Sequence, residues 1–233
     1  MTLLTTTSSV ALPQWTAFFN NFPLFLKAFL YTLDVSLAAL LLAMVLGVII
    51  GGLSTAKQKG NRVIARVYVE FYQNTPLLVQ VVFMYYGLAI ISKGFIMPSA
   101  FLTTVCCVGL YHAAYIAEVI RSGIEAVPKG QTEAALSQGF TRLQTMSLII
   151  IPQAVRTILP PLTNQVVNLI KNTSIVAIIS GADLMFTAKV WAYDTTYYVP
   201  AFAGAAFLYF ILCFPIAIFG RRQEERNKET YSL

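Results

Sequence analysis

Charged residues are scarce in this sequence, at 11% of its 233 residues, whereas a soluble domain carries about 25%. Hydrophobic residues make up 57% of the chain, and the mean hydropathy is +0.69. Apolar runs of about 20 residues, the length that crosses the hydrocarbon core of a bilayer, recur along the sequence. These features exclude an ordinary soluble domain. We therefore predict an all-α integral membrane protein with no second domain.

Histidine and cysteine are also rare. The chain has one histidine, His112, and three cysteines, all inside apolar stretches. Because no C-x-x-C pair and no cluster of histidines accompanies them, we expect no metal site. His112 lacks a serine or aspartate partner in a recognisable motif, and no G-x-S-G is present, so we expect no catalytic residue and no enzyme. The pattern G-x-x-x-x-G-K-[ST] is absent too, so we expect no cofactor on this chain and no ATP bound through a P-loop.

Basic residues are missing from the first 26 positions, which argues against a signal peptide with a charged n-region. In this stretch threonine and serine give way to aromatic residues, among them Trp15, Phe18 and Phe19. Aromatic side chains favour the interface between membrane and water. We interpret residues 1–24 as an N-terminal leader and interfacial segment.

Five membrane spans are predicted, at about residues 25–53, 69–91, 99–119, 160–180 and 200–220. Basic residues concentrate after the first, third and fifth spans. Of the sixteen, the only ones elsewhere are Lys27, Lys93, Lys171 and Lys189. By the positive-inside rule the N-terminus lies outside and the C-terminal tail, residues 223–233, lies in the cytoplasm. This one-sided distribution also argues against a nucleic-acid partner, despite the net charge of +6.

Prolines and charges refine this topology. Pro76 is expected to kink the second span or to begin its main helix. The apolar stretch 146–182 is too long for one plain span, and we expect its prolines to divide it into an entry helix ending at Pro152 and a span from about 160. Residues 183–199 are predicted to form an outer loop. Glu118 and Arg121, at the inner end of the third span, are expected to form a salt bridge.

The cytoplasmic segment between the third and fourth spans reads EAALSQGFTRLQ from Glu133 onward. Ala134 and Ala135 are strong helix formers, and Gly139 can adopt the left-handed conformation that ends a helix. Thr141 and a glutamine three residues later have the spacing of a capping box, which opens a new helix. The pattern predicts a short helix, a glycine corner and a second helix leaving at an angle.

Two groups of polar residues interrupt the predicted spans. Residues 171–174 stand near the middle of the fourth span, and residues 72–75 precede Pro76. Polar side chains at membrane depth are costly, which makes them candidates for function, and broken helices expose backbone groups to substrates. The alternatives are hydrogen bonds to neighbouring helices for the first group and an interfacial cap for the second. The candidates for a substrate path are Tyr72, Asn74, Thr75, Lys171, Asn172 and Ser174.

The E-A-A at Glu133, the glycine at Gly139 and the later Ile149, Ile151 and Pro152 resemble the EAA loop of ATP-binding-cassette (ABC) importer permeases. The family has I-x-L-P at the last position, and here Ile151 stands where leucine is usual. The stretches FYQNTPLLVQ, AAYIAEVIRSGIEAVPKGQTEAA, IIPQAVRTILPPLTNQ and LIKNTSI resemble the polar amino acid permeases of histidine, glutamine, glutamate and arginine importers. The resemblance covers about residues 25–222, which we interpret as a transmembrane permease domain.

The resemblance implies a permease subunit that forms the path of an ATP-driven amino acid importer in the bacterial cytoplasmic (inner) membrane. In such importers the EAA loop is a coupling helix that docks into a separate ATPase subunit, which binds ATP and Mg²⁺. This would assign docking to Glu133, Ala134, Ala135 and Gly139. The other implied partners are a second permease subunit, identical or homologous, and an extracytoplasmic substrate-binding protein.

The resemblance also bears on the substrate. In relatives that carry cationic amino acids, the position after the matched lysine is often acidic, whereas here it is Asn172. This favours a glutamate, glutamine or aspartate type of substrate. Gln73 departs from the arginine of the family's F-R-x-T-P. Import of a cationic amino acid or histidine, an ATP-independent channel or secondary transporter, and a permease that lacks the substrate pocket of its pair are the alternatives.

Overall fold

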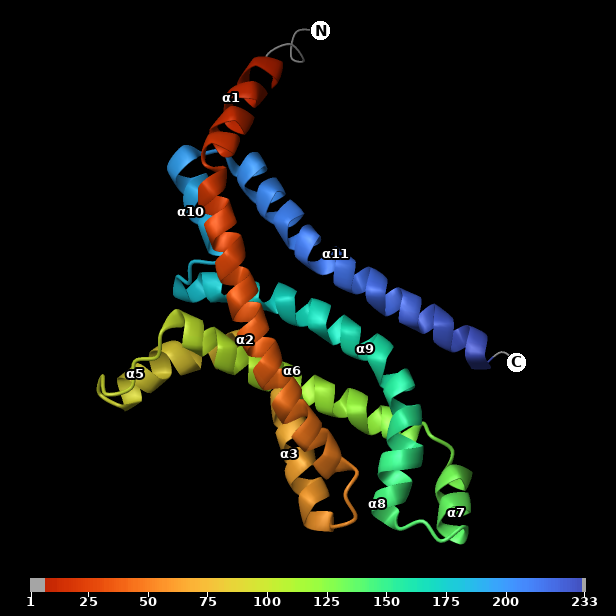
Figure 1. Ribbon diagram of the computed structural model, residues 1–233. Helices are drawn as coiled ribbons and strands as arrows, with labels where there is room; N and C mark the ends of the chain where they lie inside the picture. Colours follow the sequence, from red (N-terminus) through yellow and green to blue (C-terminus); the bar gives the residue numbers. More distant parts are fainter. Residues whose placement is uncertain (1–6, 232–233) are drawn as a thin grey trace.

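The computed structural model describes residues 7–231, and these residues fold into helices joined by short connections (Figure 1). The first six residues of the predicted leader and the last two of the predicted tail lie outside this range. The elements are α1 Thr7–Asn20, α2 Phe22–Ser54, α3 Lys59–Asn74, α4 Leu77–Val82, the π-helix η1 Phe83–Gly87, α5 Leu88–Ile91, α6 Ala100–Glu125, α7 Lys129–Ser137, α8 Arg142–Gln144, the π-helix η2 Thr145–Ile150, α9 Ile151–Asn172, the 3₁₀-helix η3 Thr173–Ile179, α10 Leu184–Thr195 and α11 Tyr198–Tyr231.

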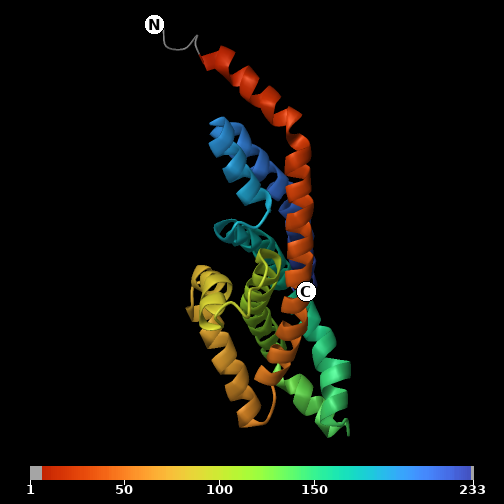
Figure 2. The same cartoon turned by 90° about the vertical axis from the view of Figure 1, so that its left-hand side faces the viewer.

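Four helical segments are long and apolar enough to cross a membrane: Phe22–Ser54, Ala100–Glu125, Arg142–Ile179 and Tyr198–Asn227. A fifth span results if the bent pair Lys59–Asn74 and Leu77–Ile91 is counted as one. The predicted all-helical architecture is therefore confirmed for the described residues, which supply four or five candidate membrane spans. The molecule is elongated, with α1 and α10 toward one end and α3, α7 and α8 toward the other (Figure 2).

Helices α2 and α6 form the central packed pair. Two glycines of α2 allow the close approach, because a Cβ on Gly47 would lie 2.6 Å from Cγ2 of Ile116 and one on Gly51 would lie 2.9 Å from Cβ of Ile120. Small residues at such positions let helix backbones meet closely in a membrane. The G-x-x-x-G pair of the first span thus packs against the same chain. Ala39, Ala43, Val108, Ile116 and Leu169 form the buried cluster at this contact.

The second predicted span is sharply bent at Pro76, as expected from the proline. The axes of Lys59–Asn74 and Leu77–Ile91 differ by 96°, and Thr75 is extended, with φ −113° and ψ 133°. A proline disfavours the α conformation of the residue before it, which explains the break. The prediction of a basic loop after the first span is wrong in part, because Lys59, Arg62 and Arg66 lie in α3.

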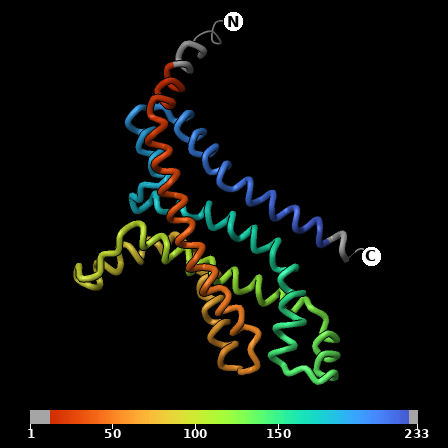
Figure 3. The backbone as a smooth tube through the Cα atoms, viewed as in Figure 1, coloured from red at the N-terminus to blue at the C-terminus, as the bar shows by residue number. Residues whose placement is uncertain are grey.

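The predicted division of the fourth apolar stretch at Pro160 and Pro161 is wrong. Pro160 and Pro161 both lie inside helix α9, and Pro152 lies in its first turn. The segment from α8 to η3 stays helical but changes direction along its length (Figure 3). Pro160 has no N–H to donate to the carbonyl of Arg156 four residues earlier. The side-chain amide of Asn227 on α11 donates to that carbonyl instead, at 2.5 Å. A distant residue therefore satisfies the group that the proline leaves unpaired.

Residues 184–195, predicted as part of an outer loop, form the helix α10 with one face buried. Asp183 caps this helix by accepting a hydrogen bond from the backbone N–H of Phe186 at 2.8 Å, and its other oxygen accepts one from the hydroxyl of Tyr209 on α11 at 3.0 Å. Thr32 on α2 accepts a hydrogen bond from the N–H of Leu184 at 3.1 Å. These bonds fix α10 against α2 and α11. Helix α11 continues past residue 222 and includes most of the predicted tail.

Candidate functional sites

The predicted glycine corner is present between α7 and α8. The N–H of Gly139 donates to the carbonyl of Leu136, and that of Phe140 donates to the carbonyl of Ala135, both at 3.1 Å. This is the Schellman pattern, which requires a left-handed residue, and Gly139 has φ +86°. Thr141 then caps α8 in a capping box with Gln144, as predicted. The corner therefore follows from local sequence alone.

Pro128 is the N-cap residue of α7. The two alanines of α7 face different ways. Ala135 is buried, at 4% exposure, on the side of α7 that contacts η2, whereas Glu133, Ala134 and Gly139 are exposed. The exposed surface of α7 and its corner includes these three residues and Leu136, which is 40% exposed, together with Lys129, Gln131 and Ser137.

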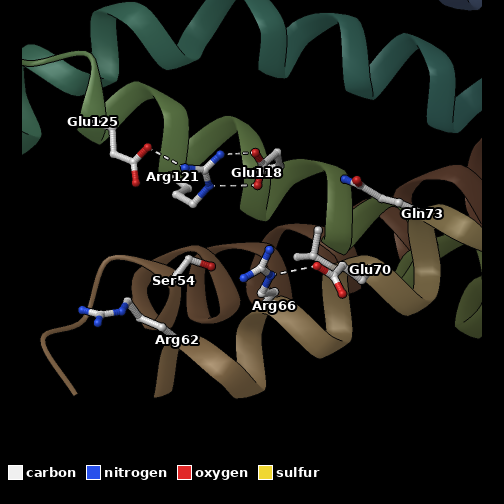
Figure 4. A pocket seen from close by; sticks show the side chains of 9 residues that line it. Ser54, Arg62, Arg66, Glu70, Gln73, Glu118, Arg121 and Glu125 are labelled. Atoms are coloured by element: carbon white, nitrogen blue, oxygen red, sulfur yellow. Dashed lines mark hydrogen bonds and ion pairs between the residues drawn. The ribbon is translucent and has the colours of Figure 1, made fainter. Parts of the chain in front are cut away.

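A charged cleft of about 520 Å³ lies between the end of α2, α3 and α6 (Figure 4). Arg121 on α6 pairs with both Glu118 and Glu125, so the predicted salt bridge between Glu118 and Arg121 is confirmed. On α3, Nε of Arg66 lies 2.8 Å from a carboxylate oxygen of Glu70. The lining residues are Ser54, Arg62, Arg66, Val69, Glu70, Gln73, Glu118, Arg121 and Glu125.

A second hollow, of about 600 Å³, shares Ser54, Arg62 and Glu125 with this cleft and extends to Lys129 and Thr132 in α7. Polar surface therefore runs from α3 and the last turns of α6 to the start of α7.

Part of the predicted substrate path lines a third cavity, of about 500 Å³. Asn172 and Ser174 contribute to it from the junction of α9 and η3, where the helix tightens from α to 3₁₀. The other lining residues are Leu77, Tyr111, Ile175, Ala177, Ile178, Met185 and Lys189. Lys171 lines an adjoining cavity of about 290 Å³, which shares Ser174 and Met185 with the first. We call these two the substrate-path cavities.

The predicted residues before Pro76 do not line these cavities. Instead, Asn74 donates to the carbonyl of Glu70 at 2.7 Å and the hydroxyl of Thr75 donates to the carbonyl of Phe71 at 2.8 Å. The ring of Tyr72 packs against that of Tyr68 in a tilted arrangement, with ring centroids 4.7 Å apart. In this structure the group caps the end of α3, the alternative considered from the sequence. The break instead brings Leu77, on its far side, into the cavity.

Three residues at the substrate-path cavities were missed in the sequence analysis. Tyr111 and Lys189 line the larger cavity, and buried His112 lies behind it, with Nε2 3.0 Å from the amide nitrogen of Asn172. A signal was present for His112, since an ionisable residue inside an apolar run is unusual, whereas a lysine in a predicted loop gives no such signal. Their significance depends on the tertiary structure, because α6 and α10 both contribute residues to the cavity that Asn172 lines.

Comparison with known proteins identifies the family. Residues 16–229 match the family described as "Binding-protein-dependent transport system inner membrane component". The chain is 37% identical to the probable glutamine ABC transporter permease protein GlnM of Bacillus subtilis (strain 168), over 91% of this chain and 97% of that protein. It is 34% identical to the probable amino-acid ABC transporter permease protein PatM of Vibrio harveyi, over 80% and 84% of the two chains.

Comparison with solved structures supports the same family. A crystal structure described as an amino acid ABC transporter with histidines superposes with a TM-score of 0.84 at 32% identity, covering 91% of this chain and 98% of that one. An inward-facing MetNI methionine ABC transporter has the same fold, with a TM-score of 0.73 at 17% identity over 87% and 95% of the two chains. The chain belongs to the family of binding-protein-dependent transport system inner membrane components, and it is a permease subunit of the amino acid ABC transporter type.

Proposed function

We propose that this permease imports a polar amino acid of the glutamine, glutamate or aspartate type, driven by ATP hydrolysis in a separate ATPase subunit. The observation that carries the proposal is the exposed α7 corner. Its helix is rigidly capped at Gly139, it is anchored through buried Ala135, and it presents Glu133 and Ala134 outward. A stiff projection of this kind can transmit a push or pull from a docked partner.

In the proposed mechanism α7 is the coupling helix, and the ATPase binds ATP and Mg²⁺. Closure of two ATPase subunits draws the two coupling helices of a permease pair together. Because the charged cleft continues from α3 and α6 to α7, this movement opens or closes the inner ends of those helices. A substrate-binding protein outside the bacterial cytoplasmic membrane delivers the amino acid, with the N-terminus of the permease outside and the C-terminus inside.

The substrate class is supported by Asn172, which contributes a neutral carboxamide to the larger substrate-path cavity. The similarity to GlnM, a probable glutamine permease, supports this choice. An acidic residue at position 172 would instead attract a cationic substrate. We therefore expect Asn172→Asp to shift uptake toward arginine. If the substrate preference of this variant equals that of the wild type, Asn172 does not set it.

The coupling role is tested by co-purification of the tagged permease with its ATPase subunit from native membranes in mild detergent. The wild type is expected to retain the ATPase, whereas Glu133→Lys and Ala134→Leu lose it, since both side chains are exposed. Glu225→Lys, an equally drastic change on the exposed side of α11, is the matched control and should retain it. Normal ATPase recovery with Glu133→Lys and Ala134→Leu would refute docking through α7.

The transport role is tested in proteoliposomes that contain the permease, the ATPase and the substrate-binding protein. Uptake of glutamine and glutamate is expected to need ATP inside the vesicles. Uptake that continues without ATP would favour the channel or secondary transporter. Preferred uptake of arginine or histidine would support the cationic alternative.

A further inference from the structure

We propose that Lys189 binds a carboxylate of the transported amino acid and thereby sets substrate charge preference. This inference rests on the proposed function, because it assumes that the substrate-path cavities carry an amino acid. The segment that contains Lys189 was predicted as an outer loop. In the structure it is the helix α10, which places Lys189 at the cavity.

The position of Lys189 is well defined. Helix α10 is held at its start by Asp183, which accepts hydrogen bonds from Phe186 and Tyr209. The ammonium group of Lys189 donates to the carbonyl of Ala177 at 3.3 Å and lies 5.4 Å from the ring centroid of Phe186. An ammonium has three N–H donors, so donors remain for a ligand after the bond to Ala177. Lys189 is half-buried and lines the larger cavity.

No carboxylate of the described residues neutralises this ammonium within 4.0 Å, the range of an ion pair. None of the described residues that line either substrate-path cavity is acidic. Lys171, in the adjoining cavity, adds a second positive charge. A charge that is partly removed from water favours an opposite charge nearby. The two cavities therefore favour a carboxylate and disfavour a guanidinium or ammonium side chain.

The cavity also offers acceptors for the ammonium group of an amino acid. The hydroxyl of Ser174 donates to the carbonyl of Lys171 at 2.7 Å, which leaves its oxygen lone pairs as acceptors. The amide nitrogen of Asn172 is directed to His112, at 3.0 Å, so the carbonyl oxygen of this carboxamide remains as a further acceptor. A donor cation on α10 and acceptors at the α9–η3 junction suit the two ends of a zwitterion.

The test compares Lys189→Gln, Lys189→Arg and Lys189→Glu in proteoliposomes that contain the complete transporter. Lys27→Gln, at an exposed lysine on α2, is the control. A hydrogen bond to a charged group is worth about 1.5–3 kcal/mol, which corresponds to roughly a tenfold to hundredfold change in affinity. We expect Lys189→Gln to raise KM by that factor. Lys189→Arg should have a KM close to that of the wild type, and the substrate preference of Lys189→Glu should shift toward arginine.

Glutamine and glutamate distinguish which carboxylate is bound. If Lys189→Gln raises KM equally for both substrates, Lys189 binds the α-carboxylate. If it raises KM for glutamate alone, Lys189 binds the side-chain carboxylate. Either result supports the inference. A Lys189→Gln transporter that retains its ATPase subunit and has wild-type KM for both would overturn it. A wild type that imports none of these amino acids would refute the proposed function itself, which separates the two failures.

Discussion

The imidazole of His112 and the carboxamide of Asn172 lie 3.0 Å apart, across the contact between α6 and the end of α9. They are 60 residues apart in the sequence. His112 is buried, at 2% exposure, while Asn172 is half-buried and reaches the cavity. His112, for which we expect no catalytic role, thus orients a residue of the proposed substrate path.

Replacing this histidine should affect stability and transport together. His112→Leu leaves the amide nitrogen of Asn172 without its partner, at a cost of about 1–3 kcal/mol, and is expected to lower the Tm and raise KM. A double-mutant cycle with Asn172→Ala, followed by thermal unfolding in detergent, checks the pair. Fully additive effects would mean that the two side chains do not act on each other.

The glycine corner gives a second prediction. A side chain at Gly139 meets no atom within 4 Å, but the residue has φ +86°, so Gly139→Ala costs about 1–2 kcal/mol through backbone conformation alone. We expect it to weaken substrate-stimulated ATP hydrolysis. Gly139→Asn should retain more activity, since asparagine tolerates this conformation.

Gly130 is the matched control for Gly139. It also has open space around it and lies in α7, but its φ is not positive, so Gly130→Ala should leave ATP hydrolysis unchanged. Equal effects of alanine at positions 130 and 139 would contradict the conformational explanation.

The contact between α9 and α11 predicts a compensating pair. Asn227→Leu removes the donor to the carbonyl of Arg156 and should lower stability by about 1 kcal/mol. In a Pro160→Ala background, the new backbone N–H can bond to that carbonyl, so Asn227→Leu should cost less. Thermal unfolding of the four proteins in the cycle measures the difference, and an unchanged cost in both backgrounds would exclude this role for Asn227.

The packing of α2 on α6 is checked with two glycines of α2. Gly47→Ala places a methyl group 2.6 Å from Ile116, and overpacking of this kind costs about 1–3 kcal/mol. Gly52→Ala meets no atom within 4 Å and should be neutral or stabilising, because alanine is the better helix former. The Tm of each variant in detergent measures these two effects. If Gly52→Ala lowered the Tm and Gly47→Ala left it unchanged, the packing argument would be refuted.

Much of the architecture was accessible from the sequence because its causes are local. Length and apolarity identify the spans, and Pro76 marks the break that the structure has between α3 and α4. The corner at Gly139 and Thr141 depends on hydrogen bonds between residues five positions apart or fewer, so its pattern can be recognised in a short stretch.

The remaining features depend on residues distant in sequence. Pro160 and Pro161 do not break α9, and the carbonyl freed by Pro160 bonds to Asn227, 71 residues from Arg156. Residues 184–195 form a helix that is held in place by Thr32 and Tyr209. Of the two predicted polar groups, only the one around Asn172 lines the substrate-path cavities.

The sequence therefore determined the class of the protein, its apolar spans and the form of the α7–α8 corner, because hydrophobic length, proline, glycine and capping act within a few residues. Only the tertiary structure decided which polar residues share a cavity. That outcome depends on helix packing, which brings Asn172, His112 and Lys189 together from α9, α6 and α10. Contacts between residues so far apart in the sequence cannot be recognised in a local sequence pattern.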